Sequence, residues 1–285
     1  MRAGSRVPAL VFAAAWVASL GVLVASGQGE PVAEAAIAAG YLALAGITIR
    51  ITHDAPFARL RTDRRRHWVQ VAVVGVFIAL IGWNGLVFHR VAGVGPVPGW
   101  GELTRGLGSV GDQLFGNGNY LANPVAYVVL PLIVLLLLGA RPRELGFGKG
   151  HRVGRVILLW AAIPIGFLAV AVATGQLSLE RVANRLVSNS MQNGFWEEFL
   201  FRGALQTRLR PLLTPQWAIV IQALVFGAWH LGLGYANTGH SGFLPALAST
   251  IVHQATIGLA FGIVFERTRN LLAPSVAHVL ANSMG

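Results

Sequence analysis

WEEFLFRG, residues 196–203, sets three charged side chains in a segment whose other residues suit a lipid bilayer. The charges are Glu197, Glu198 and Arg202. Similar isolated polar groups recur on apolar backgrounds further along the chain, at residues 226–230 (FGAWH) and 278–282 (HVLAN). Ionisable residues at membrane depth are costly and usually mark a pathway or a site. The sequence therefore predicts a functional site buried among membrane helices.

The composition around this stretch is that of an integral membrane protein. Of the 285 residues, 54% are hydrophobic and only 12% are charged, and the mean hydropathy is +0.61. A helix needs roughly 20 apolar residues to cross the hydrocarbon core. Apolar runs, most of them long enough to do so, recur at residues 7–26, 35–49, 69–88, 125–140, 156–174, 216–233 and 243–265.

Two further segments complete the predicted fold. Residues 189–209 are too polar to be identified from hydropathy, but they lie between clear spans and contain no strong breaker besides Gly194 and Gly203. We expect a helix buried among the others. Residues 273–284 predict a last, short helix with His278 and Asn282 on its polar face. The fold class is therefore all-α, a polytopic transmembrane helix bundle of about eight spans with a short terminal helix. The turn-rich loop 92–122 could be a lid, a re-entrant element or a spacer, and we expect a spacer.

The basic residues follow the loops of this bundle. A formal net charge of +11 would suit nucleic acid, but Arg and Lys gather in alternate loops. They are Arg2 and Arg6; Arg59, Arg61, Arg64, Arg65 and Arg66; Arg141, Arg143, Lys149, Arg152 and Arg155; Arg208 and Arg210; and Arg267 and Arg269. Such a positive-inside bias places the N-terminus and the basic loops in the cytoplasm. We interpret the charge as a topology signal, and expect the lipid bilayer rather than nucleic acid as a partner.

On a helix, the charged residues of the segment 196–203 lie on two different faces. Glu198 and Arg202 are four residues apart and share a face, so they can form an ion pair that neutralises both. Glu197 lies about 100° further round and faces a different neighbour. A carboxylate without a cationic partner in an apolar interior is disposed to take up a proton, as a general base does. The alternative is that the three charges only lock helices together.

The later polar groups are also spaced for a shared helix face. Phe226 and His230 are four residues apart, and so are His278 and Asn282. A lone helix histidine is more often structural than catalytic, but here a second imidazole and an amide come from another helix. Amide and imidazole N–H groups aimed at one point are the donors that an oxyanion site requires. His253 has no comparable pairing, and we expect it to form a helix–helix hydrogen bond.

Taken in order, three motifs on predicted membrane helices resemble a known family. They are Glu-Glu-x-x-x-Arg at 197–202, Phe-x-x-x-His at 226–230 and His-x-x-x-Asn at 278–282. This order is similar to that of the CPBP family, also called the ABI or CAAX protease and bacteriocin-processing family, whose eukaryotic member is the Ras-converting CAAX endopeptidase. The resemblance covers about residues 189–285, and upstream only residues 143–147 (RELGF) are similar. A departure is Arg269, where many relatives have a small turn residue.

The resemblance implies an intramembrane endopeptidase. Glu197 and His230 would hold and activate a water for attack on a peptide carbonyl, and His278 with Asn282 would stabilise the oxyanion. The supporting residues would be Glu198, Arg202 and Phe226. Residues 1–155 would form variable N-terminal transmembrane helices and residues 156–285 the CPBP-like catalytic core, together one integral membrane domain.

No cofactor is expected for this chemistry. The chain has no cysteine, which excludes disulfides and thiolate ligands. Carboxylates and imidazoles can bind zinc, but the His-Glu-x-x-His arrangement that presents two imidazoles from one helix is missing. The resemblance favours a metal-independent, glutamate-based mechanism with no metal ligands.

Two other functions stay open. A non-catalytic scaffold or bacteriocin-immunity-type protein would keep the polar cluster for folding, and a proton-linked transporter would use its carboxylates and histidines as a relay. The transporter is disfavoured because the polar groups gather in the C-terminal third, without broken helices in matching halves of the sequence. We expect a peptide or membrane-protein substrate, and a bacterial-type inner (plasma) membrane as the location.

Overall fold

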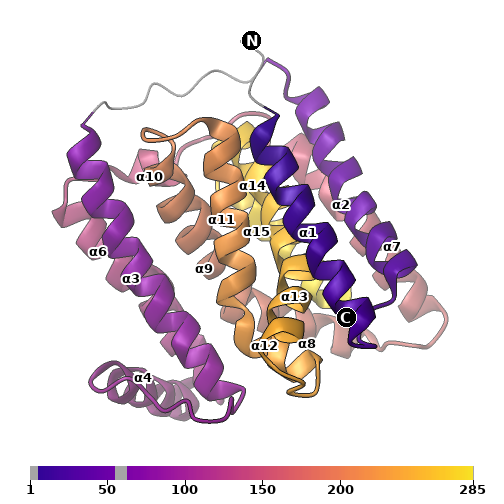
Figure 1. Cartoon of the computed structure of the whole chain (residues 1–285), viewed down its shortest axis with the longest axis horizontal. Helices are drawn as coiled ribbons and strands as arrows, with labels where there is room; N and C mark the ends of the chain where they lie inside the picture. The colour runs from indigo at the N-terminus through magenta and orange to yellow at the C-terminus, as the bar shows by residue number, and fades with distance from the viewer. Residues whose placement is uncertain (1–5, 55–62, 285) are drawn as a thin grey trace. The chain divides into compact units, whose positions relative to one another are not determined.

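The computed structural model describes residues 6–54 and 63–284, so Arg2, Arg59 and Arg61 of the basic loops lie outside the described residues. The described residues are 80% helix and contain no strand (Figure 1). The predicted all-α class is confirmed.

Six helical segments are long and apolar enough to cross a membrane. In the described part of the chain they are Val7–Ala25, Pro31–Ile51, Arg64–Phe88, Asn119–Leu137, Val153–Ala173 and Phe243–Thr268. Each of them contains most of a predicted apolar run. A seventh span is formed if Pro215–Trp229 and Leu231–Asn237 count as one. The protein is thus a multi-pass membrane protein with six or seven such spans, close to the number expected.

The span predicted at 216–233 is bent. α11 (Pro215–Trp229) and α12 (Leu231–Asn237) meet at an angle of 53°, and His230 between them donates its backbone N–H to the carbonyl of Gly227 at 3.0 Å. α12 packs against α3 (Arg64–Phe88) and α13 (Phe243–Thr250). A Cβ added at Gly234 would meet the backbone of Ala246. Beyond the bend, α12 therefore packs closely against α13 at Gly234, a contact that hydropathy does not register.

The chain divides into two compact units, each made of three segments. Unit 1 comprises Met1–Gly46, Ala58–Glu102 and Leu205–Ile263. Its elements are α1 (Val7–Ala25), most of α2 (Pro31–Ile51), α3, α10 (Thr207–Leu209), α11, α12, α13, the π-helical turn η5 (Ile251–Ala255) and part of α14 (Thr256–Thr268). Phe12, Val220, Ala223, Ile251 and Ala255 form a buried core cluster in this unit.

Polar side chains also join the helices of unit 1. His253 Nδ1 lies 3.1 Å from Oε2 of Glu34 on α2. His253 therefore contacts another helix, but the contact lacks the geometry of the hydrogen bond expected of it. Arg208 is buried, and its Nη1 donates to Oε1 of Gln70 on α3 at 3.1 Å. Arg208 therefore has a packing role in addition to any contribution to topology.

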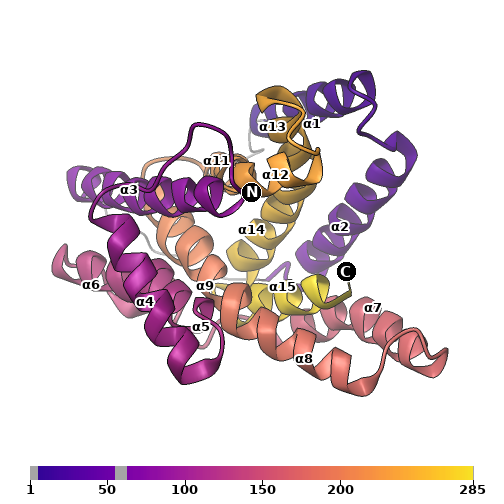
Figure 2. The same ribbon diagram turned by 90° about the horizontal axis from the view of Figure 1, so that it is seen from below.

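Unit 2 comprises Ile47–Phe57, Leu103–Ala204 and Val264–Gly285. Its elements include most of α4 (Trp100–Phe115), α5 (Asn119–Pro124), η1 (Val125–Val129), α6 (Leu130–Leu137), η2 (Pro142–Leu145), α7 (Val153–Ala173), α8 (Leu179–Asn189), η3 (Ser190–Gly194), α9 (Phe195–Glu198), most of η4 (Phe199–Gln206) and α15 (Leu272–Met284). α15 packs against α7 and α8 (Figure 2). The predicted short terminal helix is confirmed, whereas a domain boundary at 155/156 stays a prediction.

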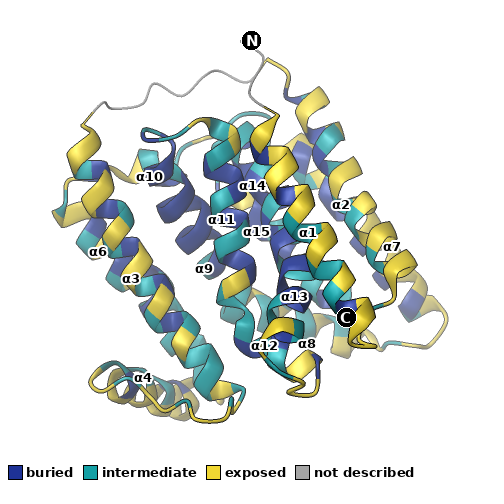
Figure 3. Cartoon of the chain, viewed as in Figure 1, coloured by how far each residue is buried: buried dark blue, intermediate teal, exposed yellow. Residues whose placement is uncertain are grey.

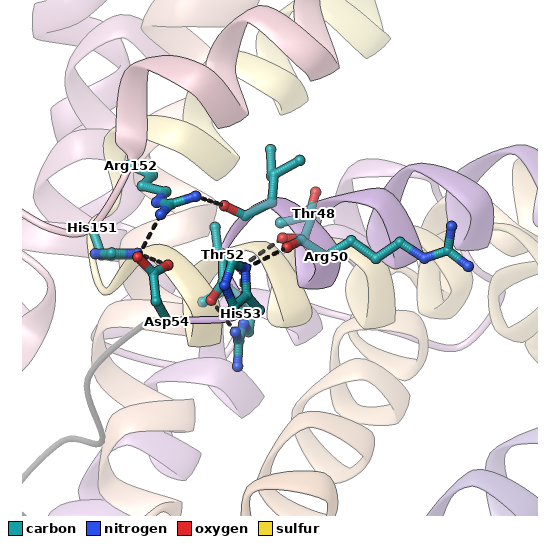
Figure 4. Close-up of polar contacts among 9 residues, drawn as sticks. Thr48, Arg50, Thr52, His53, Asp54, His151 and Arg152 are labelled. Atoms are coloured by element: carbon teal, nitrogen blue, oxygen red, sulfur yellow. Dashed lines mark hydrogen bonds and ion pairs between the residues drawn. The ribbon is translucent and has the colours of Figure 1, made fainter.

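A polar network in unit 2 joins the end of α2 to the start of α7 (Figure 4) and to the end of α14. Arg152 donates to Asp54, and Nε2 of His151 lies 3.0 Å from Oδ1 of the same carboxylate. Arg267 Nε donates to Oγ1 of Thr52 at 2.9 Å. Desolvation opposes ionisation of Asp54, but the His151 hydrogen bond and the Arg152 charge lower its pKa below the ordinary value. The Asp54 carboxylate therefore connects the segment after α2 to the start of α7, and Thr52 connects it to the end of α14.

Burial separates the helices into two groups. Residues of α9, α11, α14 and α15 are largely buried, whereas α1, α2, α3 and α7 expose one face (Figure 3). The exposed faces are apolar, with Leu10 at 65%, Val32 at 83% and Leu158 at 73% exposure. In a membrane protein such faces contact lipid, because lipid tails are as apolar as these side chains.

Residues 92–122 contain a helix that the sequence did not predict. α4 occupies Trp100–Phe115 within the segment expected to be a spacer. Its glycines lower helix propensity by about 1 kcal/mol each relative to alanine, which is why composition alone indicated a loop. The apolar side chains of α4 nevertheless recur at helical spacing.

Candidate active site

The segment with the two glutamates is a helix with widened turns. α8 begins after Ser178, whose hydroxyl accepts the N–H of Arg181 at 3.1 Å. The π-helical segments η3 and η4 then flank α9, which carries Glu197 and Glu198. π-helical turns are rare in proteins, but those that occur are often found at functional sites. The buried helix predicted at 189–209 is confirmed, with a geometry that hydropathy does not reveal.

Glu198 is fully buried between two nitrogen partners. Its Oε1 lies 3.0 Å from Nη1 of Arg202, and it accepts a hydrogen bond from Nδ1 of His278 at 2.8 Å. The side chains of Glu198 and Arg202 are 0% exposed. The predicted ion pair is confirmed, and the structure adds His278 to it. Because Nδ1 donates its proton to Glu198, a neutral His278 ring carries its lone pair on Nε2.

Glu197 faces the same imidazole from the other ring nitrogen. Its Oε2 lies 3.8 Å from Nε2 of His278. This distance is too long for a direct hydrogen bond, and a polar separation above 3.5 Å suits a bridging water. The neighbour left open for Glu197 by the sequence is therefore His278.

Tyr127 is a polar residue near the glutamates that the sequence analysis missed. It lies on η1, which packs against α9, and it interacts electrostatically with Glu197. Upstream of Tyr127, Asn123 Nδ2 donates to the carbonyl of Gln192 at 2.8 Å and ties α5 to η3. The only sequence signal was a lone hydroxyl within the apolar run 125–140.

α15 holds His278 in place through contacts at its end. Asn189 Nδ2 donates to Oγ of Ser283 at 3.2 Å, and Arg185 Nη1 donates to the Ser283 carbonyl at 3.3 Å. Asn282 lies one turn after His278 and is partly buried. The last turn of α15 is thus anchored to α8.

The start of α15 is held by the upstream stretch 143–147 that resembles the family. The N–H of Leu271 donates to the carbonyl of Gly146 at 3.1 Å, and a Cβ at Gly146 would overlap Phe265 and Leu271. Arg269 in the same turn has a φ of +55°, a left-handed conformation that costs least for glycine, which has no Cβ. The φ value explains why a turn residue such as glycine suits that position. The contacts of Gly146 explain why residues 143–147 resemble the family together with the C-terminal motifs, since the two segments pack against each other.

His230 belongs to unit 1, so its approach to Glu197 stays a prediction. Its Nδ1 lies 2.9 Å from the carbonyl of Phe226, and its ring packs edge-on against Phe226 and Trp229 with centroids 4.6 Å from each. The predicted neighbourhood of Phe226 and His230 is confirmed. A carbonyl accepts only from Nδ1–H, so the neutral ring carries its lone pair on Nε2.

Within the described residues, no group of three or more His, Asp or Glu side chains is arranged to hold a metal ion. The cluster of unit 2 combines two carboxylates with one imidazole and one guanidinium, which suits proton transfer and charge stabilisation.

These features define a multi-pass helical membrane protein with a buried Glu–His–Glu cluster. Residues 180–284 match a family model described as Rce1-like, type II CAAX prenyl endopeptidase Rce1-like. This segment is about a third of the chain, and the match supports the resemblance to the CPBP or CAAX protease family that the motifs indicated. No curated protein and no solved structure matches the chain.

The contact between the glutamate helix and α15 requires glycine at position 194. A Cβ there would overlap the side chain of Val279. We expect Gly194→Ala to destabilise the protein by about 1–3 kcal/mol, the usual effect of overpacking, and to lower the melting temperature in detergent. The matched control is Gly166→Ala in α7, where an added Cβ meets nothing within 4 Å. Equal melting temperatures for the two variants would contradict this contact.

Removal of Arg202 strands the buried carboxylate of Glu198. Loss of one partner from such a pair costs roughly 3–5 kcal/mol, so we expect Arg202→Ala to lower both thermal stability and activity. Arg155→Ala, on an exposed position of α7, serves as the control and should melt near the wild type. A stable Arg202→Ala protein would mean that the pair does not brace the site.

Proposed function

We propose that this protein is an intramembrane glutamate-type endopeptidase, in which Glu197 and His230 activate a water that hydrolyses a peptide bond. The observation that carries the proposal is the buried imidazole of His278 between Glu197 and Glu198. These residues lie inside the segment that matches CAAX prenyl endopeptidases. The residue types therefore agree with the chemistry of the matched family.

The first step assigns Glu197 as general base. Glu197 takes a proton from the water as the water oxygen bonds to the peptide carbonyl carbon, with the lone pair on Nε2 of His230 helping to hold the water. The C–N bond then breaks, and the proton on Glu197 passes to the leaving amine. A positioned base of this kind contributes roughly 10²–10⁴-fold to the rate.

His278 and Asn282 stabilise the oxyanion of the tetrahedral intermediate. Nδ1 of His278 is engaged by Glu198 at 2.8 Å, so Nε2 is the nitrogen available to the reacting groups. Nε2 donates to the oxyanion when the ring holds both protons, and the carboxylate on Nδ1 holds the ring in position, as in a Ser-His-Asp triad. Glu198 thereby acts through His278, and Arg202 balances the remaining charge.

The substrate is a peptide or a membrane-protein tail in a bacterial-type inner membrane, with the N-terminus and the basic loops in the cytoplasm. The alternate placing of Arg and Lys supports this orientation. The mechanism is metal-independent.

A scaffold would keep the same ion pair for folding but would not need a proton acceptor at Glu197, and this difference separates the two functions.

Glu197→Gln keeps the shape of the side chain and removes its basicity. We expect cleavage to fall by about 10²-fold or more, with membrane expression unchanged. The measurement is mass spectrometry of membrane peptides from cells that carry the wild type or the variant. Glu180→Gln, the same change on an exposed residue of α8, is the control. Unaltered products with Glu197→Gln would leave the scaffold as the better function.

The shared site of Glu197 and His230 has its own test in this cysteine-free chain. We expect Glu197→Cys combined with His230→Cys to crosslink with a short bifunctional thiol reagent, because both side chains must reach one water. Each single-cysteine variant must first react with a monofunctional reagent. Absence of a crosslink between two reactive cysteines would refute the paired activation of water.

A further inference from the structure

α4 is amphipathic along its whole length. At 100° per residue, its apolar stripe consists of Trp100, Leu103, Leu107, Val110 and Leu114. Its opposite face carries Glu102, Arg105, Ser109, Asp112 and Gln113. The helix is not among the segments that could cross a membrane. Its side chains are therefore divided between an apolar and an aqueous environment.

Much of the apolar stripe is exposed, although Trp100 and Leu107 are partly buried. Leu103 is 43% exposed, Val110 46% and Leu114 65%, and Phe115 at the end of the helix is 53% exposed. An exposed apolar stripe of this kind marks an interaction surface. Figure 3 shows the alternation of exposed and partly buried residues along α4.

A third side of α4 packs against the start of α5. A Cβ on Gly111 would lie 2.7 Å from the carbonyl oxygen of Gly118, and one on Gly118 would lie 2.8 Å from that of Gly108. Such close contact leaves no room for side chains. The glycines therefore hold α4 against the chain, so that the apolar stripe beside them stays turned outwards.

The beginning of α4 lies alongside α3 rather than beyond its end. Residues 89–99 fold back, because Trp83 Nε1 donates to the carbonyl of Gly95 at 2.7 Å and the ring of Trp100 packs against Phe77, with centroids 6.3 Å apart. α3 is a candidate span whose end exposes Phe88 at 73%. The stripe of α4 thus begins beside the apolar surface of a membrane span.

We propose that α4 is an interfacial helix, lying in the outer headgroup region with Leu103, Leu107, Val110 and Leu114 immersed at the boundary of the acyl chains. The helices on both sides of it in the sequence, Arg64–Phe88 and Asn119–Leu137, are long and apolar enough to cross a membrane, so α4 connects two candidate spans and lies where the chain leaves one and enters the next. A helix with a strong apolar face and a polar opposite face binds in this plane. Its polar face has two acidic residues and one basic residue, so the attraction is hydrophobic rather than electrostatic.

Single cysteines in nanodiscs of phosphatidylcholine and phosphatidylglycerol test this placement. An environment-sensitive NBD label goes on Leu103→Cys, Val110→Cys or Leu114→Cys, and on the polar-face controls Ser109→Cys and Gln113→Cys. We expect blue-shifted emission on the stripe, strong quenching by doxyl-labelled lipids and several-fold weaker quenching by iodide than at the controls. High salt should leave this pattern unchanged.

Two outcomes would overturn the proposal. Iodide quenching on the stripe that equals the quenching at Ser109 and Gln113 would place α4 in water. Protection from both iodide and doxyl lipids would mean that protein, such as a second copy of the chain, covers the stripe. Neither outcome bears on peptide cleavage, so the placement of α4 and the catalytic role of Glu197 are tested separately.

Discussion

The buried carboxylate of Glu198 is the constraint on which unit 2 depends. A charge without water must be paired and hydrogen-bonded, and Glu198 meets this requirement with Arg202 on its own helix and His278 on α15. The first contact is local, but the second joins residues 80 positions apart. Both contacts are made by Oε1 of Glu198. If α15 moved away, the buried Glu198 carboxylate would lose its hydrogen bond from His278. The electrostatic requirement therefore fixes a helix–helix contact.

Close packing makes this contact possible. Gly194 allows the glutamate helix to approach Val279, and Gly203 lies against the carbonyl of Leu145, where a Cβ would come within 2.8 Å. The π-helical turns on both sides of α9 redirect its side chains relative to a regular α-helix. In a membrane protein, small residues at helix contacts replace the hydrophobic driving force that is weak between apolar surfaces in lipid. The contact between the helix that carries Glu198 and α15 therefore depends on both a glycine, Gly194, and an ion pair with a hydrogen bond at Glu198.

Local regularities made part of this structure predictable. Apolar runs gave the spans, and the four-residue spacing gave the Glu198–Arg202 pair and the Phe226–His230 contact, because helical geometry relates nearby residues directly. Contacts between distant segments were not predictable in the same way. The Glu34 partner of His253 and the Gln70 partner of Arg208 lie far away in sequence. α4 was missed because its glycines outweigh a periodic stripe, and the bend at residue 230 because it arises from tertiary packing.

The distribution of burial explains why the resemblance is confined to the C-terminal part of the chain. The apolar window of Phe243–Thr268 is 67% buried, whereas those of Val7–Ala25 and Pro31–Ile51 are 17% and 11% buried. A lipid-facing helix needs only apolar side chains of suitable length, so many sequences satisfy it. A helix that encloses Glu198 and Arg202 must supply partners at fixed positions and glycines where backbones meet. The matched residues 180–284 contain both glutamates, Arg202 and His278, so the recognisable sequence is the part in which polar chemistry restricts the choice of residue.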